Sequence, residues 1–162
     1  MTPTIQLAIL LGRTDRAGTA IEELWRHAQT SVAGTDAQIR CIAVHAVQGD
    51  SSEMLSHAEV KVVALKVPMD GKVTGLVKSW AAKEGVLGIA GRLAQHNFAS
   101  RRVARALMKD SLLMQTFCES NVIVSADPEA DRAVWRLRGR TAAHLMHGPF
   151  AMAHALSEVA QE

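Results

Sequence analysis

Residues 5–11, Ile5-Gln-Leu-Ala-Ile-Leu-Leu11, and the segment that follows them, Gly12-Arg-Thr-Asp-Arg-Ala-Gly18-Thr19, decide the fold. A short, nearly continuous apolar run is typical of a strand that is buried on both faces. Gly12 ends this run, and Thr19 with Glu22 forms a T-x-x-E capping box. The box predicts a helix that begins at Thr19. A strand that leads through a glycine-bounded loop into a helix indicates an α/β fold.

The rest of the chain repeats this alternation of strands and helices. The first helix should end at Gly34, and Asp127-Pro128 predicts another helix, because an aspartate N-cap is followed by proline at the first helical position. Apolar runs predict further strands at residues 39–47, 59–67, 122–124 and 141–146, with a closing helix at residues 150–160. We therefore expect a Rossmann-like, mostly parallel sheet flanked by helices, as one domain over residues 1–162.

A long segment in the middle, residues 72–119, lacks proline and is predicted to be mainly helical. Its first half contains Gly85-Val-Leu-Gly-Ile-Ala-Gly91, which fits either a helix or a short strand. Its second half shows a clear apolar face. The residues on that face are Val103, Ala106, Leu107, Leu113, Met114 and Phe117.

Composition narrows the class of protein. The chain has 162 residues, of which 48% are hydrophobic, and its 18 basic and 16 acidic residues give a net charge of +2. That charge is too small to indicate a nucleic-acid partner. Cys41 and Cys118 are the only cysteines, and both are interpreted as small buried hydrophobes in a reducing compartment. No signal peptide or spanning segment is recognised, so the expected location is the cytoplasm, with peripheral contact to a membrane as an option.

The loop after the first strand is the strongest candidate for a ligand site. In open α/β sheets, ligands gather at the carboxyl ends of the strands, where helix N-termini offer N–H groups to anions. The loop matches neither the Walker pattern nor G-x-G-x-x-G, so neither an NTPase nor a dinucleotide enzyme is indicated. A purely structural turn is the alternative. The candidate ligand-binding residues are Gly12, Arg13, Arg16, Gly18 and Thr19.

A basic helix in the middle segment is the second feature. The stretch from Lys78 to Lys109 contains seven basic residues and one acidic residue, Glu84. Such a helix can rest on anionic lipid or bind an acidic partner, although an ordinary solvated face is the alternative interpretation. The candidate membrane- or anion-binding residues are Arg101, Arg102, Arg105 and Lys109.

Histidines at predicted strand ends are the only catalytic candidates. His45 follows the second strand and His147 precedes Gly148, so either side chain could act as a general base in a shared crevice, or could simply be packed or exposed. No metal-ligand spacing is present, and neither a metal nor a cofactor is expected. Asp127 and Asp131 are interpreted as helix-cap and first-turn acids, and Ser125 lacks the setting of a nucleophile.

Several segments together resemble a known family. Gly18-Thr19-Ala-Ile-Glu22-Glu-Leu-Trp-Arg-His-Ala28 is similar to the first loop and helix of GT-B-fold glycosyltransferases, and the strands at residues 39–44 and 60–65 are similar to the next two of that family. Asn121-Val-Ile-Val-Ser125-Ala-Asp-Pro128 resembles the end of the N-terminal lobe, and Thr141-Ala-Ala-His-Leu-Met-His147-Gly148 resembles the strand and turn that lead onward. The chain departs from the family at Ala17, which stands where the first glycine of a pair is expected.

The resemblance implies the acceptor-side lobe of such an enzyme, or a stand-alone relative, which is not catalytically complete alone. A nucleotide-sugar or glycan acceptor and a second lobe would be its partners. The alternative is a non-enzymatic, Rossmann-like interaction or dimerisation domain, which should expose a sizeable apolar patch and form a homo-oligomer.

Overall fold

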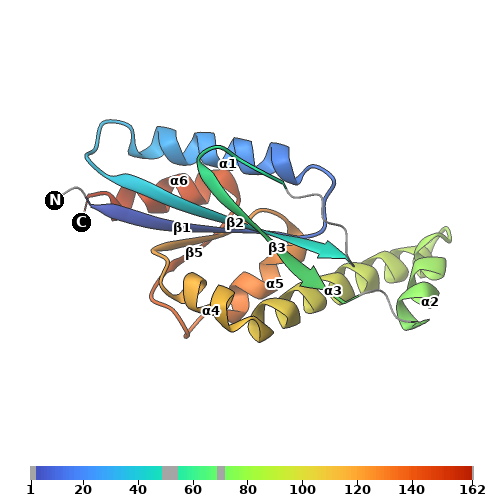
Figure 1. Cartoon of the computed structure of the whole chain (residues 1–162). Helices are drawn as coiled ribbons and strands as arrows, with labels where there is room; N and C mark the ends of the chain where they lie inside the picture. The colour runs from blue at the N-terminus through green and yellow to red at the C-terminus, as the bar shows by residue number, and fades with distance from the viewer. Residues whose placement is uncertain (1–2, 49–54, 69–71, 162) are drawn as a thin grey trace.

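The computed structural model describes residues 3–48, 55–68 and 72–161, and it contains a five-stranded sheet in which all paired strands run parallel (Figure 1). The strand order is β3-β2-β1-β4-β5. The strands are β1 (Thr4–Leu11), β2 (Gln38–Gln48), β3 (Val60–Val67), β4 (Val122–Ser125) and β5 (His144–His147). This arrangement confirms the predicted α/β fold with a Rossmann-like parallel sheet.

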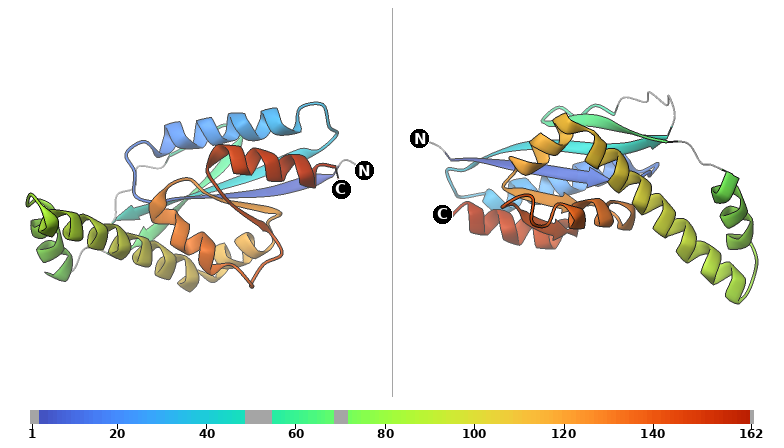
Figure 2. Two further views of the ribbon diagram at one scale, coloured as in Figure 1. Left: turned by 180° about the vertical axis from the view of Figure 1, so that it is seen from behind. Right: turned by 90° about the horizontal axis from the view of Figure 1, so that it is seen from below.

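Helices cover both faces of the sheet. One face carries α1 (Ala17–Val32) and α6 (Gly148–Val159), and the other carries α3 (Val86–Lys109), α4 (Ser111–Cys118) and α5 (Pro128–Arg136). The remaining helix, α2 (Lys72–Ala81), packs against the first half of α3. Together they form a hairpin that projects beyond the end of the sheet, as Figures 1 and 2 show.

The apolar run that opens the chain is nearly continuous because β1 lies in the middle of the sheet. Successive side chains of a strand point to opposite faces. Leu7 and Ile9 accordingly join the core under α1 and α6, whereas Ala8 and Leu10 join the core under α3, α4 and α5. Both faces of β1 are therefore shielded from water, which requires apolar side chains at the centre of the strand.

The start of α1 differs from the predicted capping box. The helix begins at Ala17, with Arg16 at the N-cap and no side-chain cap, so the box at Thr19 is wrong. Glu22 instead contacts His57, with 2.8 Å between its Oε2 and His57 Nε2. His57 Nδ1 accepts the backbone N–H groups of Glu59 and Val60, which leaves the ring proton on Nε2 for Glu22. The carboxylate thus ties α1 to the segment before β3.

The glycine-rich middle segment is helical. Gly85 has a φ of +80° and precedes α3, so the alternative of a strand over Gly85–Gly91 is wrong. A Cβ on Gly91 would overlap the backbone of Ala81 at the end of α2. A glycine is therefore required there for the two helices of the hairpin to approach each other. The second half of the predicted helix divides at Asp110, whose Oδ1 accepts the N–H of Leu113 and caps α4.

The second half of the sheet follows the prediction closely. Asp127 caps α5 through a hydrogen bond from the N–H of Ala130, with Pro128 at the first helical position. The last strand spans His144–His147, slightly later than predicted, and it leads directly into α6. Gly34, with a φ of +92°, follows the end of α1 as expected.

Candidate functional site

The order of strands reverses direction between β1 and β4, and at this point the carboxyl edge of a doubly wound sheet usually binds its ligand. Here the N-cap residue and a first-turn side chain of α5 occupy the position. Asp127 Oδ2 accepts the N–H of Gly12 at 2.6 Å, and Glu129 Oε2 accepts the N–H of Arg13 at 2.9 Å. The Arg13 guanidinium also pairs with Glu129 at 3.3 Å. Two backbone donors that an anion could have used are therefore already bonded to carboxylates of the chain.

Gly12 is required for this closure. A Cβ at that position would lie 2.5 Å from Glu129 Cβ and 2.7 Å from Asp127 Oδ1. Real Cβ contacts are not that short, so any larger residue would push the start of α5 away from the end of β1. The first glycine of the candidate loop thus serves the contact between β1 and α5.

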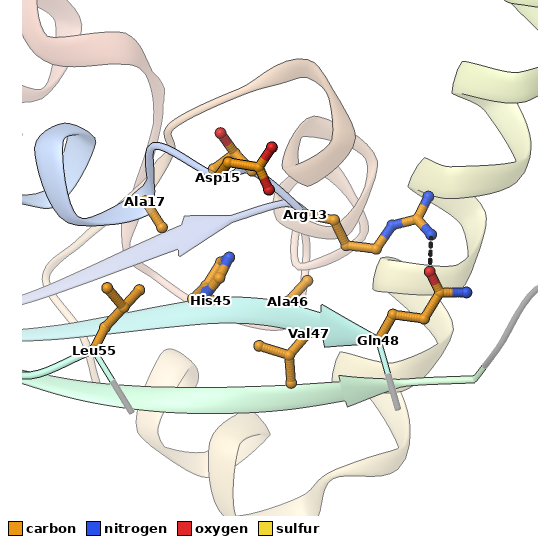
Figure 3. A pocket seen from close by; sticks show the side chains of 9 residues that line it. Arg13, Asp15, Ala17, His45, Ala46, Val47, Gln48 and Leu55 are labelled. Atoms are coloured by element: carbon orange, nitrogen blue, oxygen red, sulfur yellow. Dashed lines mark hydrogen bonds between the residues drawn. The ribbon is translucent and has the colours of Figure 1, made fainter. Parts of the chain in front are cut away.

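A pocket of about 330 Å³ opens beside this junction, at the carboxyl ends of β1 and β2 (Figure 3). Arg13 lies at one end of it, where its Nη1 donates to Gln48 Oε1 at 3.3 Å, and His45 rises from β2 toward the first loop. The lining residues are Arg13, Thr14, Asp15, Ala17, His45, Ala46, Val47, Gln48 and Leu55. The pocket therefore combines a guanidinium, a carboxylate, an amide and an imidazole with apolar side chains.

His45 is the most unusual member of the pocket. Its Nε2 is buried and has no hydrogen-bond partner among the residues that the structure describes. Burial lowers the pKa of His45 below 6.5, although a backbone hydrogen bond with Thr14 and the charge of Asp127 act in the opposite direction. The ring is therefore neutral at physiological pH. In the tautomer that is protonated on Nδ1, its Nε2 accepts a hydrogen bond, so a bound hydroxyl or amide could supply the missing donor.

The structure brings only part of the predicted ligand loop to this pocket. Arg13 lines it, whereas Gly12 is buried at the junction with α5. Arg16 forms the N-cap of α1, and Gly18 and Thr19 lie exposed in its first turn. These three residues are outside the lining.

A second pocket, of about 530 Å³, lies at the carboxyl ends of β4 and β5. Ser125, Asp131 and His147 meet there: Ser125 Oγ lies 2.6 Å from Asp131 Oδ1 and 3.0 Å from His147 Nδ1, and that nitrogen lies 2.7 Å from the same carboxylate oxygen. Trp135 and Arg138 follow Asp131 at helical spacing and line the pocket with it. Sequence inspection missed this cluster, because Ser125 and Asp131 each look ordinary in their own segments.

The three residues do not form a serine-hydrolase triad. In a triad the serine and the carboxylate contact different nitrogens of the imidazole, whereas here both contact Nδ1 of His147. The arrangement instead orients the ring. With Nδ1 engaged by Asp131, the other ring nitrogen, Nε2, remains for a ligand hydroxyl on a side chain that is 62% exposed.

His45 and His147 do not share one crevice. His45 lies on β2 and faces the α1 side of the sheet, as do its neighbours Cys41 and Ala43, whereas His147 contacts α5 on the opposite side. β1 and β4 lie between β2, which carries His45, and β5, which ends at His147. At normal strand spacing, the two histidines are therefore roughly 14 Å apart. The expected convergence of the first loop with both histidines therefore holds only for His45.

The candidate basic residues are divided between two surroundings. Arg102, Arg105 and Lys109 line a groove with Lys66 of β3, and Arg101 is exposed outside that lining. In the described ranges 3–48, 55–68 and 72–161, no three potential metal ligands cluster and no helix has the length and apolarity needed to span a bilayer. Burial raises the pKa of the Cys41 thiol to about 12, which fits its interpretation as a small hydrophobe.

Comparisons with known proteins do not add a family assignment. No protein-family description, curated protein or solved structure matches this chain. The functional argument therefore rests on the geometry of the sheet edge and its pockets.

Proposed function

We propose that this chain is the acceptor-side lobe of a GT-B-like glycosyltransferase, or a stand-alone relative of one, and that it needs a second lobe for sugar transfer. The observation that carries the proposal is the pocket at the ends of β1 and β2, where His45 Nε2 has no partner among the described residues and the Arg13 guanidinium, held by Glu129 and Gln48, lies at one end. A neutral imidazole suits an acceptor hydroxyl, and a guanidinium suits a phosphate.

Among the described residues, the lining opposite His45 comes from the first loop and Leu55, which leaves the pocket open on one side. Two-lobed transferases place substrates between lobes, so one half of the contacts would come from elsewhere.

Calorimetry with uridine diphosphate and with a methyl glycoside tests this proposal. We expect weak binding of at least one probe to the chain, and we expect His45→Leu to reduce it about tenfold, because an aliphatic side chain has no hydrogen-bond acceptor. His154→Leu is the matched control, since that ring is exposed on α6 and lines neither pocket. If neither probe binds, and no added partner lobe restores transfer, the proposal loses its support.

A second function, that of a non-enzymatic interaction domain, is favoured by the hairpin of α2 and α3. Large apolar side chains fall on one face of each helix, at i, i+4 on α2 and at i, i+3, i+7 on α3. They are Leu76, Trp80, Val86, Ile89 and Leu93, with exposed fractions between 52% and 83%. Such exposure on a projecting element is typical of an interaction surface.

An anionic membrane is the partner that we infer for the hairpin. Lys78 on α2, Lys83 in the turn and Arg92 on α3 place positive charge beside the apolar side chains. This combination suits an interface where lipid headgroups meet the acyl chains. We expect co-sedimentation with vesicles that contain phosphatidylglycerol and none with neutral vesicles, and Ile89→Glu/Leu93→Glu should abolish it. A stable dimer in light scattering that the same variant dissolves would assign the surface to self-association instead.

A further inference from the structure

β3 is the edge strand of the sheet, so one side of its backbone has no neighbouring strand among the described elements. Edge strands present rows of N–H and C=O groups that can pair with another chain. Lys61, Ala64 and Lys66 of β3 are exposed. An extended segment that is added at this edge would therefore displace no strand of the described sheet.

A groove of about 650 Å³ lies where this edge meets the second half of α3. Its lining includes Lys66, Arg102, Arg105 and Lys109, and the only acidic residue among the described residues that line it is Asp110. One oxygen of that carboxylate already accepts the N–H of Leu113. The remaining lining is apolar and comes from Ala64, Leu65, Pro68 and Ala106. The groove is thus cationic along one wall and apolar at its base.

The cations form a row rather than a cluster around one point. Arg102, Arg105 and Lys109 extend about 10 Å along the axis of α3. A single phosphate would contact only part of this row. In an extended peptide, alternate side chains lie about 7 Å apart, so two acidic residues on one face would reach both ends of the row.

Charge also selects among the strands that could pair with β3. A second copy of this chain would bring its own Lys61 and Lys66 to the edge, and like charges on paired strands are destabilising. The same argument disfavours any basic strand. Two interactions favour an acidic strand: its backbone can pair with the edge of β3, and its carboxylates face the row of cations.

We propose that this groove binds an acidic, extended peptide segment that adds to the sheet beside β3. The backbone of β3 provides hydrogen bonds, and the basic side chains of α3 select the carboxylates that point toward this helix, while the alternate apolar side chains point to the opposite face of the sheet. This site lies on a different edge of the sheet from the pocket of His45, and its failure would leave the proposed function untouched.

Fluorescence anisotropy with a labelled ten-residue Glu-Val repeat tests the selection of charge. We expect this peptide to bind and the corresponding Lys-Val repeat to fail. Arg105→Glu should weaken binding about tenfold, whereas Arg101→Glu, the same charge change on an exposed neighbour outside the groove, should weaken it about twofold or less. Equal losses from the two variants would overturn the proposal, because they would indicate general attraction to a basic surface.

Hydrogen exchange tests strand addition separately from charge. Bound Glu-Val peptide should slow exchange of amides within residues 60–67, and a peptide of the same sequence that is N-methylated at alternate residues should bind about tenfold more weakly. Unchanged binding of the methylated peptide would overturn the proposal. Tighter binding of inorganic polyphosphate without protection of β3 would also overturn it, and would make the groove a phosphate site. Both readouts use the wild-type protein and do not depend on the folding of a variant.

Discussion

The junction of β1 with α5 is closed by polar contacts, whereas the α2–α3 hairpin exposes apolar side chains. At the junction, Asp127 and Glu129 bond the backbone donors that follow β1, and Gly12 leaves no spare volume. On the hairpin, Trp80 and Leu93 are more than half exposed. The position where this class of sheet usually binds ligands is therefore closed by the chain itself, and the surfaces left for partners lie beside it and beyond it.

The difference between these regions also concerns stability. Polar side chains at the junction join segments that are 115 residues apart, whereas α2 packs mainly against its neighbour α3. Loss of a contact at the junction should consequently affect the whole sheet, and loss of an exposed hairpin side chain should affect only binding.

Paired alanine substitutions on α3 should give the largest contrast. Leu107 is fully buried under the sheet, and Leu107→Ala should lower the free energy of unfolding by about 2–5 kcal/mol. Leu93 is 67% exposed, and Leu93→Ala should change it by less than about 0.5 kcal/mol. Urea denaturation measures both. A large cost at Leu93 would show that the hairpin surface is covered in solution.

A second pair compares two aspartate caps. Asp127 caps α5 and also accepts the N–H of Gly12, whereas Asp110 caps α4 alone. Losing a cap costs about 1 kcal/mol, and leaving a buried N–H without an acceptor adds about 1–3 kcal/mol. We therefore expect Asp127→Ala to destabilise the protein by about 2–4 kcal/mol and Asp110→Ala by about 1 kcal/mol. Equal losses in thermal or urea unfolding would contradict the role of Asp127 as a link between β1 and α5.

His45 should make stability depend on pH. Its pKa is lower in the folded protein than the ordinary 6.5, so the unfolded chain binds the proton more readily. The free energy of unfolding should be fully retained above pH 6.5 and should fall as the pH drops below it. His45→Gln should flatten this dependence, and His154→Gln, a change on an exposed ring, should leave it in place. An unaltered slope in His45→Gln would assign the effect to other groups.

The two cysteines should differ in their reactivity in the native protein. Burial holds the pKa of the Cys41 thiol near 12, so almost no thiolate is present at pH 8. A thiol reagent should label Cys118 first and reach Cys41 only after unfolding, and Cys118→Ser should remove the fast phase. Rapid labelling of the Cys118→Ser variant would show that the core around β2 opens under native conditions.

The fold was predictable where the signals are local. The apolar run of β1 reports burial on both faces, and Asp127-Pro128 marks the start of α5 because cap and first turn are adjacent in the sequence. The capping box at Thr19 failed for a non-local reason. Glu22 is bonded to His57, 35 residues away, and no pattern within the helix contains that information.

The candidate site was less predictable for the same reason. The pocket of His45 was found in part, because strand ends and first loops are recognisable features of α/β sheets. The contact of Arg13 with Glu129 and the meeting of Ser125, Asp131 and His147 depend on the order in which the strands are placed side by side. That order follows from packing of the whole chain, and periodicity within a segment does not encode it.

The central position of β1 has a consequence for how the protein is made. β1 pairs with β2 soon after it is synthesised, but its other neighbour is β4, and Leu7 aligns with Val122. Until β4 leaves the ribosome, one side of a very apolar strand has no partner, and distant pairings of this kind form slowly. The nascent chain should therefore depend on chaperones over most of its length, and a chain truncated before Val122 should aggregate in a cell-free translation from which chaperones are omitted.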